Sequence, residues 1–173
     1  MIPGTLFNIP IWTLPTLNFS KKKKQLDRLV KAFPEEKTGL QAFSTNRQSD
    51  RTGFSQAFYN IMEDELTMLM NRIKKTIIIE DIWSVSYKKG DYHSPHNHGT
   101  IGFAGILYLE FPEGSQPTSY IQPWQNINND TTMFNSLPVK EGDIVIVPKF
   151  VNHFSAPHKG KKQKRIISWD MKI

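Results

Sequence analysis

A chain of 173 residues is long enough to form one domain with a hydrophobic core of useful size. The absence of cysteine excludes a disulfide-stabilised fold and a thiolate metal site, and it fits a reducing compartment. The net charge of +6 attracts anionic partners but identifies none of them.

The first residues lack the basic region of a signal peptide, and no apolar run reaches membrane-spanning length, so we expect a cytoplasmic protein. Residues 6–17 are apolar and interrupted by prolines, which is typical of an edge strand or an extended arm. Ser20 can cap a helix whose apolar stripe ends at Phe33, before Pro34. A polar segment, predicted as a long loop, precedes a second helix over residues 55–75.

The strands are predicted in the remainder of the chain. Alternating apolar residues indicate a strand that ends before Gly90, and they are Trp83, Val85 and Tyr87. No repeat or low-complexity linker divides the sequence. We therefore expect a single domain over residues 1–173, with a supporting arm and helices in residues 1–75 and the core in residues 76–173.

All five histidines lie in two short clusters that each follow an apolar strand: His93, His96 and His98, then His153 and His158. His96 and His98 project to the same side of an extended backbone, where two imidazoles can hold one metal ion. His153 follows the strand-like residues 143–148 and is the candidate for a third ligand. Imidazole suits iron, copper, zinc and nickel, so the ligands alone do not choose the metal. His158 lies beside lysines, and we expect it to be a solvated loop residue.

A longer ordered pattern extends from Trp83 to Trp169. A tyrosine and a glycine precede H-x-H, a strand with a tyrosine follows, an acidic-glycine turn leads to a distal histidine, and an arginine comes 12 residues later. The matching residues are Tyr87, Gly90, His96, His98, Tyr108, Glu141, Gly142, His153 and Arg165. This order resembles the Fe(II)- and 2-oxoglutarate-dependent oxygenases, particularly the small prolyl-hydroxylase-like members of bacteria and phages, and it is more specific than any single motif.

The resemblance implies an α+β, mainly β fold, with a double-stranded β-helix core of the jelly-roll or cupin type and N-terminal supporting helices. It implies a dioxygenase that uses Fe(II) and the co-substrate 2-oxoglutarate to hydroxylate a protein side chain, a nucleobase or a small metabolite. The implied iron ligands are His96, His98 and His153, and no catalytic residue is implied beyond the metal centre. The implied co-substrate ligands are Arg165, whose planar fork suits a carboxylate, and the hydroxyls of Tyr87 and Tyr108.

One position departs from the family pattern. His98 stands where the usual set of two histidines and one carboxylate has its carboxylate, although some small members share this H-x-H sequence. Three neutral imidazoles leave the metal centre one negative charge short, which changes its redox potential and its affinity for an anionic co-substrate. Asp91 lies at the wrong offset from His96 to replace the missing carboxylate.

The same histidines also fit part of the cupin pattern. Gly90 precedes H-x-H at the cupin spacing, and Gly142 and Pro148 precede His153 as they do in cupins. This similarity leaves open a three-histidine metalloenzyme that needs no 2-oxoglutarate. Arg165 favours the oxygenase, because a cupin has no need of a cation for a distal carboxylate.

A third alternative is a jelly-roll module without enzymatic activity, which binds an anionic partner and in which the histidines are incidental. The basic runs at Lys21–Lys24 and at Lys159–Arg165 are the segments that attract such a partner. Neither run has the interleaved aromatic residues of a single-strand binding groove, so nucleic acid is not favoured and we expect solvated faces. The substrate and the oligomeric state stay open.

Overall fold

The computed structural model describes residues 9–33, 35–37, 44–45, 52–126 and 128–173. Within these ranges, two helices and eleven strands are formed. In chain order they are β1 (Trp12–Pro15), α1 (Phe19–Ala32), β2 (Glu36–Lys37), β3 (Ser44–Thr45), α2 (Thr52–Ile73), β4 (Ile78–Tyr87), β5 (His93–His96), β6 (Phe103–Glu110), β7 (Ser119–Gln125), β8 (Thr132–Ser136), β9 (Asp143–Pro148), β10 (His153–Ser155) and β11 (Lys164–Lys172).

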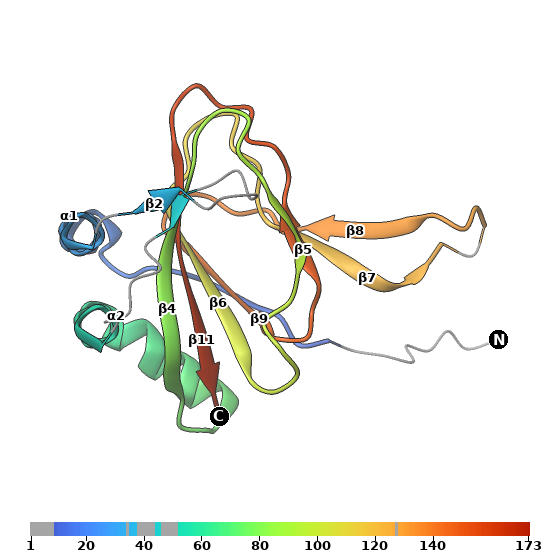
Figure 1. Cartoon of the computed structure of the whole chain (residues 1–173). Helices are drawn as coiled ribbons and strands as arrows, with labels where there is room; N and C mark the ends of the chain where they lie inside the picture. Colours follow the sequence, from blue (N-terminus) through green and yellow to red (C-terminus); the bar gives the residue numbers. More distant parts are fainter. Residues whose placement is uncertain (1–8, 34, 38–43, 46–51, 127) are drawn as a thin grey trace.

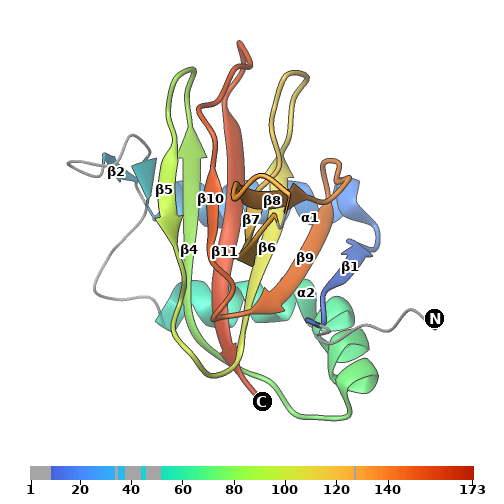
Figure 2. The same cartoon turned by 90° about the vertical axis from the view of Figure 1, so that its right-hand side faces the viewer.

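The strands form two antiparallel sheets. The larger sheet has the order β1-β9-β6-β11-β4-β3-β2, and the smaller has the order β5-β10-β7-β8. Both helices cover one face of the larger sheet, and the smaller sheet lies on its other side, while the hairpin of β7 and β8 extends away from the body (Figure 1 and Figure 2). This arrangement confirms the predicted double-stranded β-helix core with supporting helices.

The two helices begin and end within three residues of their predicted positions. α1 starts before Ser20, and its N-cap is Asn18, in the left-handed region at φ 51° and without a side-chain cap, so the predicted Ser20 cap is wrong. α2 has a kink at Met62, where the backbone leaves helical geometry. Among the described residues, neither helix is long and apolar enough to cross a bilayer.

The N-terminal strand confirms the prediction of an edge strand. Among the described strands, β1 pairs only with β9 and lies at one edge of the larger sheet. Residues 6–8 of the predicted segment lie outside the described residues. Of the predicted loop between the helices, the described part contains β2 and β3, which pair with each other and continue the larger sheet from β4.

Alternate residues of β11 point to opposite sides of the larger sheet, and each side packs into its own core. Ile167, Trp169 and Met171 belong to the core beneath the helices, whereas Ile166 belongs to the core between the two sheets. A glycine is required at position 105 of β6, because an added Cβ would lie 2.1 Å from the Trp169 indole. The alternation decides which side chains of β11 reach the space between the sheets.

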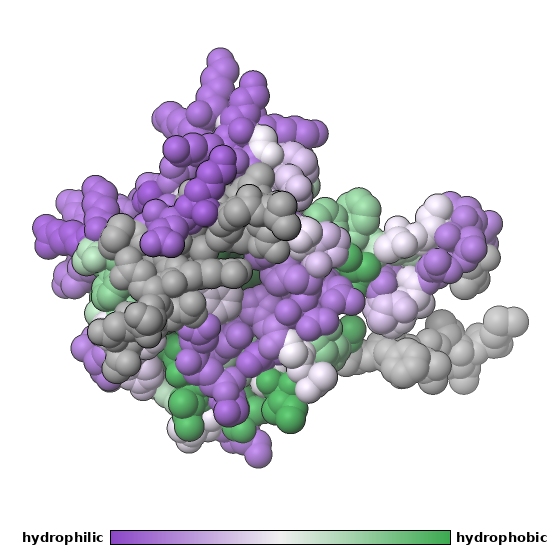
Figure 3. Space-filling view, viewed as in Figure 1, coloured by the Kyte–Doolittle hydropathy of each residue, from purple (hydrophilic) through white to green (hydrophobic). Residues whose placement is uncertain are grey.

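The two basic segments have different environments. Lys22 is buried on α1 and forms ion pairs of 2.7 Å with Glu65 and 3.1 Å with Asp64, and Lys23 pairs with Glu141. The prediction of a solvated face is therefore wrong for Lys22, whereas Lys21 and Lys24 are exposed. The second segment does have exposed lysines, at positions 159, 161 and 162. Its loop, between β10 and β11, lies at the upper end of the molecule in Figure 1, which is hydrophilic in Figure 3.

His158 is buried, not solvated as predicted. Its backbone N–H donates to the Asp91 carbonyl and its carbonyl accepts from the Gly90 N–H, both at 2.8 Å. Its Nε2 lies 2.7 Å from the Lys162 carbonyl oxygen. These contacts join the loop after β10 to the loop after β4. His158 therefore has a structural role, separate from the cluster of His93, His96 and His98.

Candidate metal centre

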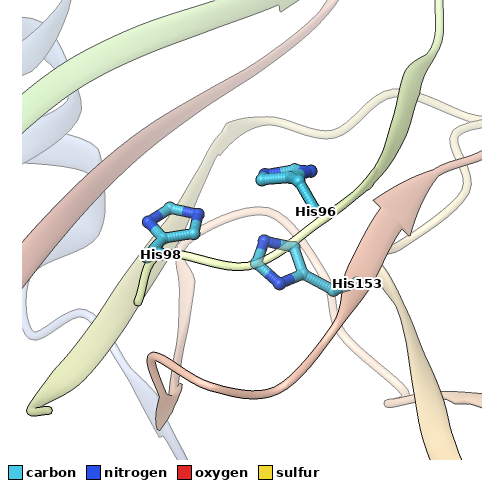
Figure 4. A group of neighbouring side chains, drawn as sticks. All are labelled: His96, His98 and His153. Carbon is cyan, nitrogen blue, oxygen red and sulfur yellow. The ribbon is translucent and has the colours of Figure 1, made fainter. Parts of the chain in front are cut away.

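The structure brings together three of the five histidines. His96 ends β5, His98 follows two residues later, and His153 begins β10, opposite His96 in the antiparallel register. One nitrogen of each imidazole lies within 4.8 Å of the others, a spacing at which one ion can contact all three. Figure 4 shows the three rings converging from β5, from the turn that follows it and from β10.

The hydrogen bonds of the three rings determine which nitrogen of each ring carries the proton. Nδ1 of His96 lies 2.8 Å from the Ser94 carbonyl, and Nδ1 of His153 lies 2.9 Å from the Val151 carbonyl. A carbonyl oxygen only accepts, so each Nδ1 carries the proton and each Nε2 keeps its lone pair. His98 repeats this pattern with Asp170, whose Oδ1 lies 2.6 Å from its Nδ1. In this tautomer, each Nε2 has the lone pair that a metal ligand needs.

The electrostatics of the site keep one of the candidate metal-binding residues, His153, neutral. Burial lowers the pKa of His153 to about 3, with further lowering from the nearby His96 and His98. A metal needs the unprotonated imidazole, and His153 is in that form throughout the neutral range. The other two imidazoles stack on neighbouring rings. The ring centroids of His93 and His96 are 3.9 Å apart, and those of Trp83 and His98 are 5.4 Å apart.

A small cavity, partly open to solvent, lies beside the histidines, between the two sheets. Its walls include the three histidines and the apolar side chains of Val85, Ala104, Ile106 and Ile166. The polar residues around it include Tyr87 and Ser155. The arrangement places a candidate metal site at the side of a largely apolar cavity.

The cation next to this cavity is Lys164. Its side chain is 1% exposed, with Nζ 4.2 Å above the Tyr87 ring, 3.3 Å from Ser155 Oγ and 3.1 Å from the Gln116 carbonyl. Burial lowers its pKa to about 8 and is the only cause of the change, so no carboxylate of the described residues compensates the charge. A buried cation without a counter-ion is suited to an anionic ligand.

Arg165 does not reach the cavity, and the prediction that it lies beside the metal ligands is corrected. It points to the opposite face of β11, where Nε donates to Ser86 Oγ at 3.0 Å. Its guanidinium also lies 3.4 Å from Glu110 and 3.6 Å from Glu35. The physical reason is the two-residue period of the strand, which sends neighbouring side chains to opposite sides.

The two predicted tyrosines have different positions. Tyr87 lines the cavity and hydrogen-bonds with Ser155, and its burial raises the pKa of the phenol well above its usual value. Tyr108 is also buried, but its hydroxyl accepts a 3.1 Å hydrogen bond from the Thr118 backbone N–H, and Thr118 is the residue that lines the cavity. Tyr108 thus supports the wall and does not form it.

Sequence reasoning missed both Lys164 and Asp170. The parity of β11 was the available signal, because Lys164, Ile166, Ser168 and Asp170 alternate with the residues of the core beneath the helices. The lysine run before Arg165 concealed the signal, since a charged run is normally a solvated one.

The sequence matches the protein family described as "Putative 2OG-Fe(II) oxygenase" over residues 81–170, slightly more than half of the chain. The matched segment contains the three converging histidines, Lys164 and Asp170. A search of curated proteins finds no significant match.

Solved structures with a similar fold include an oxidoreductase of the 2OG-Fe(II) oxygenase family from Burkholderia pseudomallei, at 12% identity and a TM-score of 0.71 over 94% of this chain and 84% of that chain. HygX from Streptomyces hygroscopicus, solved with nickel, 2-oxoglutarate and hygromycin B, has 9% identity and a TM-score of 0.71 over 95% and 83% of the chains. The viral collagen prolyl hydroxylase vCPH of Paramecium Bursaria Chlorella virus-1 has 15% identity and a TM-score of 0.61 over 93% and 94%. At these identities the likeness shows the fold alone.

Proposed function

The chain belongs to the 2OG-Fe(II) oxygenase family, and from this premise we propose that it is an Fe(II)- and 2-oxoglutarate-dependent dioxygenase that hydroxylates an unidentified substrate. His96, His98 and His153 would hold the iron through their Nε2 atoms. Lys164, in place of the predicted Arg165, would bind the distal carboxylate of 2-oxoglutarate. The observation that carries the proposal is the buried, uncompensated Lys164 beside the cavity of the three histidines.

Bound iron would supply the activation of dioxygen and the oxidative decarboxylation of the co-substrate. The chain's own contribution is binding and orientation. The Lys164 ammonium has three N–H donors, of which two reach the Gln116 carbonyl and Ser155 Oγ, which leaves one for a ligand oxygen. A carboxylate placed there would compensate the buried charge, and that compensation favours the bound state.

The remaining cavity residues have complementary roles in this proposal. The raised pKa of Tyr87 keeps its phenol protonated at neutral pH, so that it can hydrogen-bond to a ligand or to Ser155 without adding negative charge. The apolar side chains of Val85, Ile106 and Ile166 exclude water from the space between Lys164 and the metal ligands. Exclusion of water strengthens the attraction between the ammonium and an anionic ligand.

The adjacent residues Lys164 and Arg165 offer a matched pair of variants for the test. We would add Fe(II) and then 2-oxoglutarate to the apoprotein without oxygen, and follow the charge-transfer absorption that requires both. Lys164→Ala should weaken 2-oxoglutarate binding more than about 30-fold, because removing one partner of a buried charge pair costs about 2–5 kcal/mol. Arg165→Ala removes an equal charge from the other face and should keep the absorption, with circular dichroism as the check that both variants fold.

Each alternative has its own outcome in this experiment. Retention of the absorption in Lys164→Ala together with its loss in a folded Arg165→Ala would refute the assignment of Lys164. Stoichiometric iron binding by the native protein without any response to 2-oxoglutarate would instead favour the three-histidine metalloenzyme. No binding of iron would contradict both enzymes and leave the jelly-roll binding module.

A further inference from the structure

The three proposed ligands are all histidines, whereas the usual family set is two histidines and one carboxylate. Asp170 contacts His98, the histidine that stands at the position of that carboxylate. We propose that Asp170 supplies the missing negative charge from behind His98, so that the site has the same net charge as a set with a carboxylate ligand. Asp170 is then a positioning residue that acts on the metal through the imidazole. The inference rests on the proposed metal site and adds a residue that the pattern of ligands does not contain.

The contact between the two side chains is short and largely shielded from water. Asp170 Oδ1 lies 2.6 Å from His98 Nδ1, and the two side chains are 16% and 9% exposed. Trp83 stacks on the His98 ring and limits its rotation. A carboxylate at this distance orients the imidazole and makes its far nitrogen a stronger donor, because part of the negative charge is shared with the ring.

The other two ligands contact backbone carbonyl oxygens through Nδ1. Nδ1 of His96 and Nδ1 of His153 face backbone carbonyl oxygens, which orient the rings but carry no net charge. His98 stands where the usual family pattern has its carboxylate, and its Nδ1 faces the Asp170 carboxylate. That coincidence is the reason to assign the charge of Asp170 to the metal site.

A cation near Asp170 could cancel this charge, and the structure shows what that cation contacts. Lys149 Nζ lies 3.8 Å from Asp170 Oδ2 but only 2.9 Å from Glu80 Oε2. Glu80 also pairs with Lys172. Lys149 is thus bound more closely to Glu80, and Asp170 Oδ1 is left to His98.

β11 consequently presents two opposite charges on the side that faces the space between the sheets. Lys164 begins the strand and Asp170 lies near its end, separated by the cavity-lining Ile166 and Ser168. The cation would face the anionic co-substrate, and the anion would face the metal through His98. A single strand, β11, would therefore carry both the charge that faces the co-substrate and the charge that faces the metal.

The test measures metal affinity by calorimetry with Co(II) alone, without 2-oxoglutarate and without turnover. Asp170→Asn keeps an oxygen that can accept from His98 Nδ1 but removes the charge, and we expect Co(II) affinity to fall about 10- to 100-fold. Glu110→Gln is the matched control, because it removes a half-buried carboxylate that contacts Arg165 on the other face of the sheet. Its affinity for Co(II) should equal that of the native protein.

Lys149→Gln provides a readout of opposite sign. Removing this cation makes the surroundings of Asp170 more negative, so Co(II) should bind severalfold more tightly than in the native protein. A purely structural role of this region would weaken binding in both variants. Tighter binding by Lys149→Gln with weaker binding by Asp170→Asn supports the charge assignment, even where Asp170→Asn is less stable.

Three results would overturn the inference. Native-like Co(II) affinity in Asp170→Asn means that the hydrogen bond and not the charge matters, and weaker binding in Lys149→Gln means that packing dominates. Both leave the proposed metal site intact. Absence of Co(II) binding by the native protein, with no difference from His153→Ala, refutes the metal site itself and this inference with it.

Discussion

The affinity for 2-oxoglutarate should fall as the pH rises from 7 to 9, because the proposed anchor Lys164 loses its proton in this range. Burial lowers the pKa of this ammonium to about 8 in the free protein. The carboxylates of 2-oxoglutarate stay ionised at both pH values, since carboxyl groups titrate near pH 4. The ligand therefore binds the charged form of Lys164 and loses its partner above pH 8.

The magnitude follows from the charged fraction of Lys164. With a pKa of about 8, roughly nine-tenths of the side chain is charged at pH 7 and roughly one-tenth at pH 9. The apparent affinity should therefore fall about tenfold between these values. Calorimetric titration of 2-oxoglutarate into the Co(II)-loaded protein, at half-unit steps of pH and without oxygen, measures this change directly.

Lys164→Arg separates the charge of the anchor from other effects of pH. A guanidinium stays charged to above pH 12, so this variant should show little change in affinity between pH 7 and 9. Any slope that it keeps reports hydroxide competing for the metal and is subtracted. An equal pH dependence in the native protein and in Lys164→Arg would refute the role of Lys164 as the titrating anchor.

Three substitutions, with Gly53→Ala as a control, test packing and buried charges of the fold by urea unfolding at pH 7. Lys164→Met should stabilise the apoprotein by about 1–2 kcal/mol, since burial that lowers the lysine pKa from 10.5 to about 8 costs ~3 kcal/mol and the lost hydrogen bonds offset part of that gain. Gly105→Ala should destabilise by at least 1–3 kcal/mol, as is typical of overpacking, whereas Gly53→Ala, exposed on α2 with no contact nearer than 3.8 Å, should not destabilise. Lys22→Met should destabilise by about 3–5 kcal/mol because it leaves Glu65, 2% exposed, without its cation. Unchanged stability of Gly105→Ala would contradict the close packing against Trp169, and unchanged stability of Lys22→Met would contradict the importance of the ion pair with Glu65.

The sequence predicted the elements whose signal is local. The two helices lie close to their predicted ranges because their apolar residues recur at helical spacing and a proline ends the first. The histidines were predicted to converge because two of them share one side of an extended segment and the third follows a separate strand. The order of these residues also indicated the family, which the sequence match confirms.

Contacts between distant segments could not be predicted in this way. Lys22 lies in a lysine run that looks solvated, but the packing of α1 on α2 buries it against Glu65, 43 residues later. His158 looks like a loop residue, but it bonds to the loop that follows β4. Both cases depend on which elements meet in space, and nothing within the surrounding sequence specifies that.

The chemistry of the site divides along the same line. The sequence by itself indicated which three imidazoles come together and that a cation lies near the start of the last strand. Only the tertiary structure placed Lys164, and not its neighbour Arg165, beside the cavity, because neighbouring side chains of a strand point to opposite faces. Only the tertiary structure placed Asp170 behind His98, since 72 residues separate them and pairing of β11 within the sheet is what joins them.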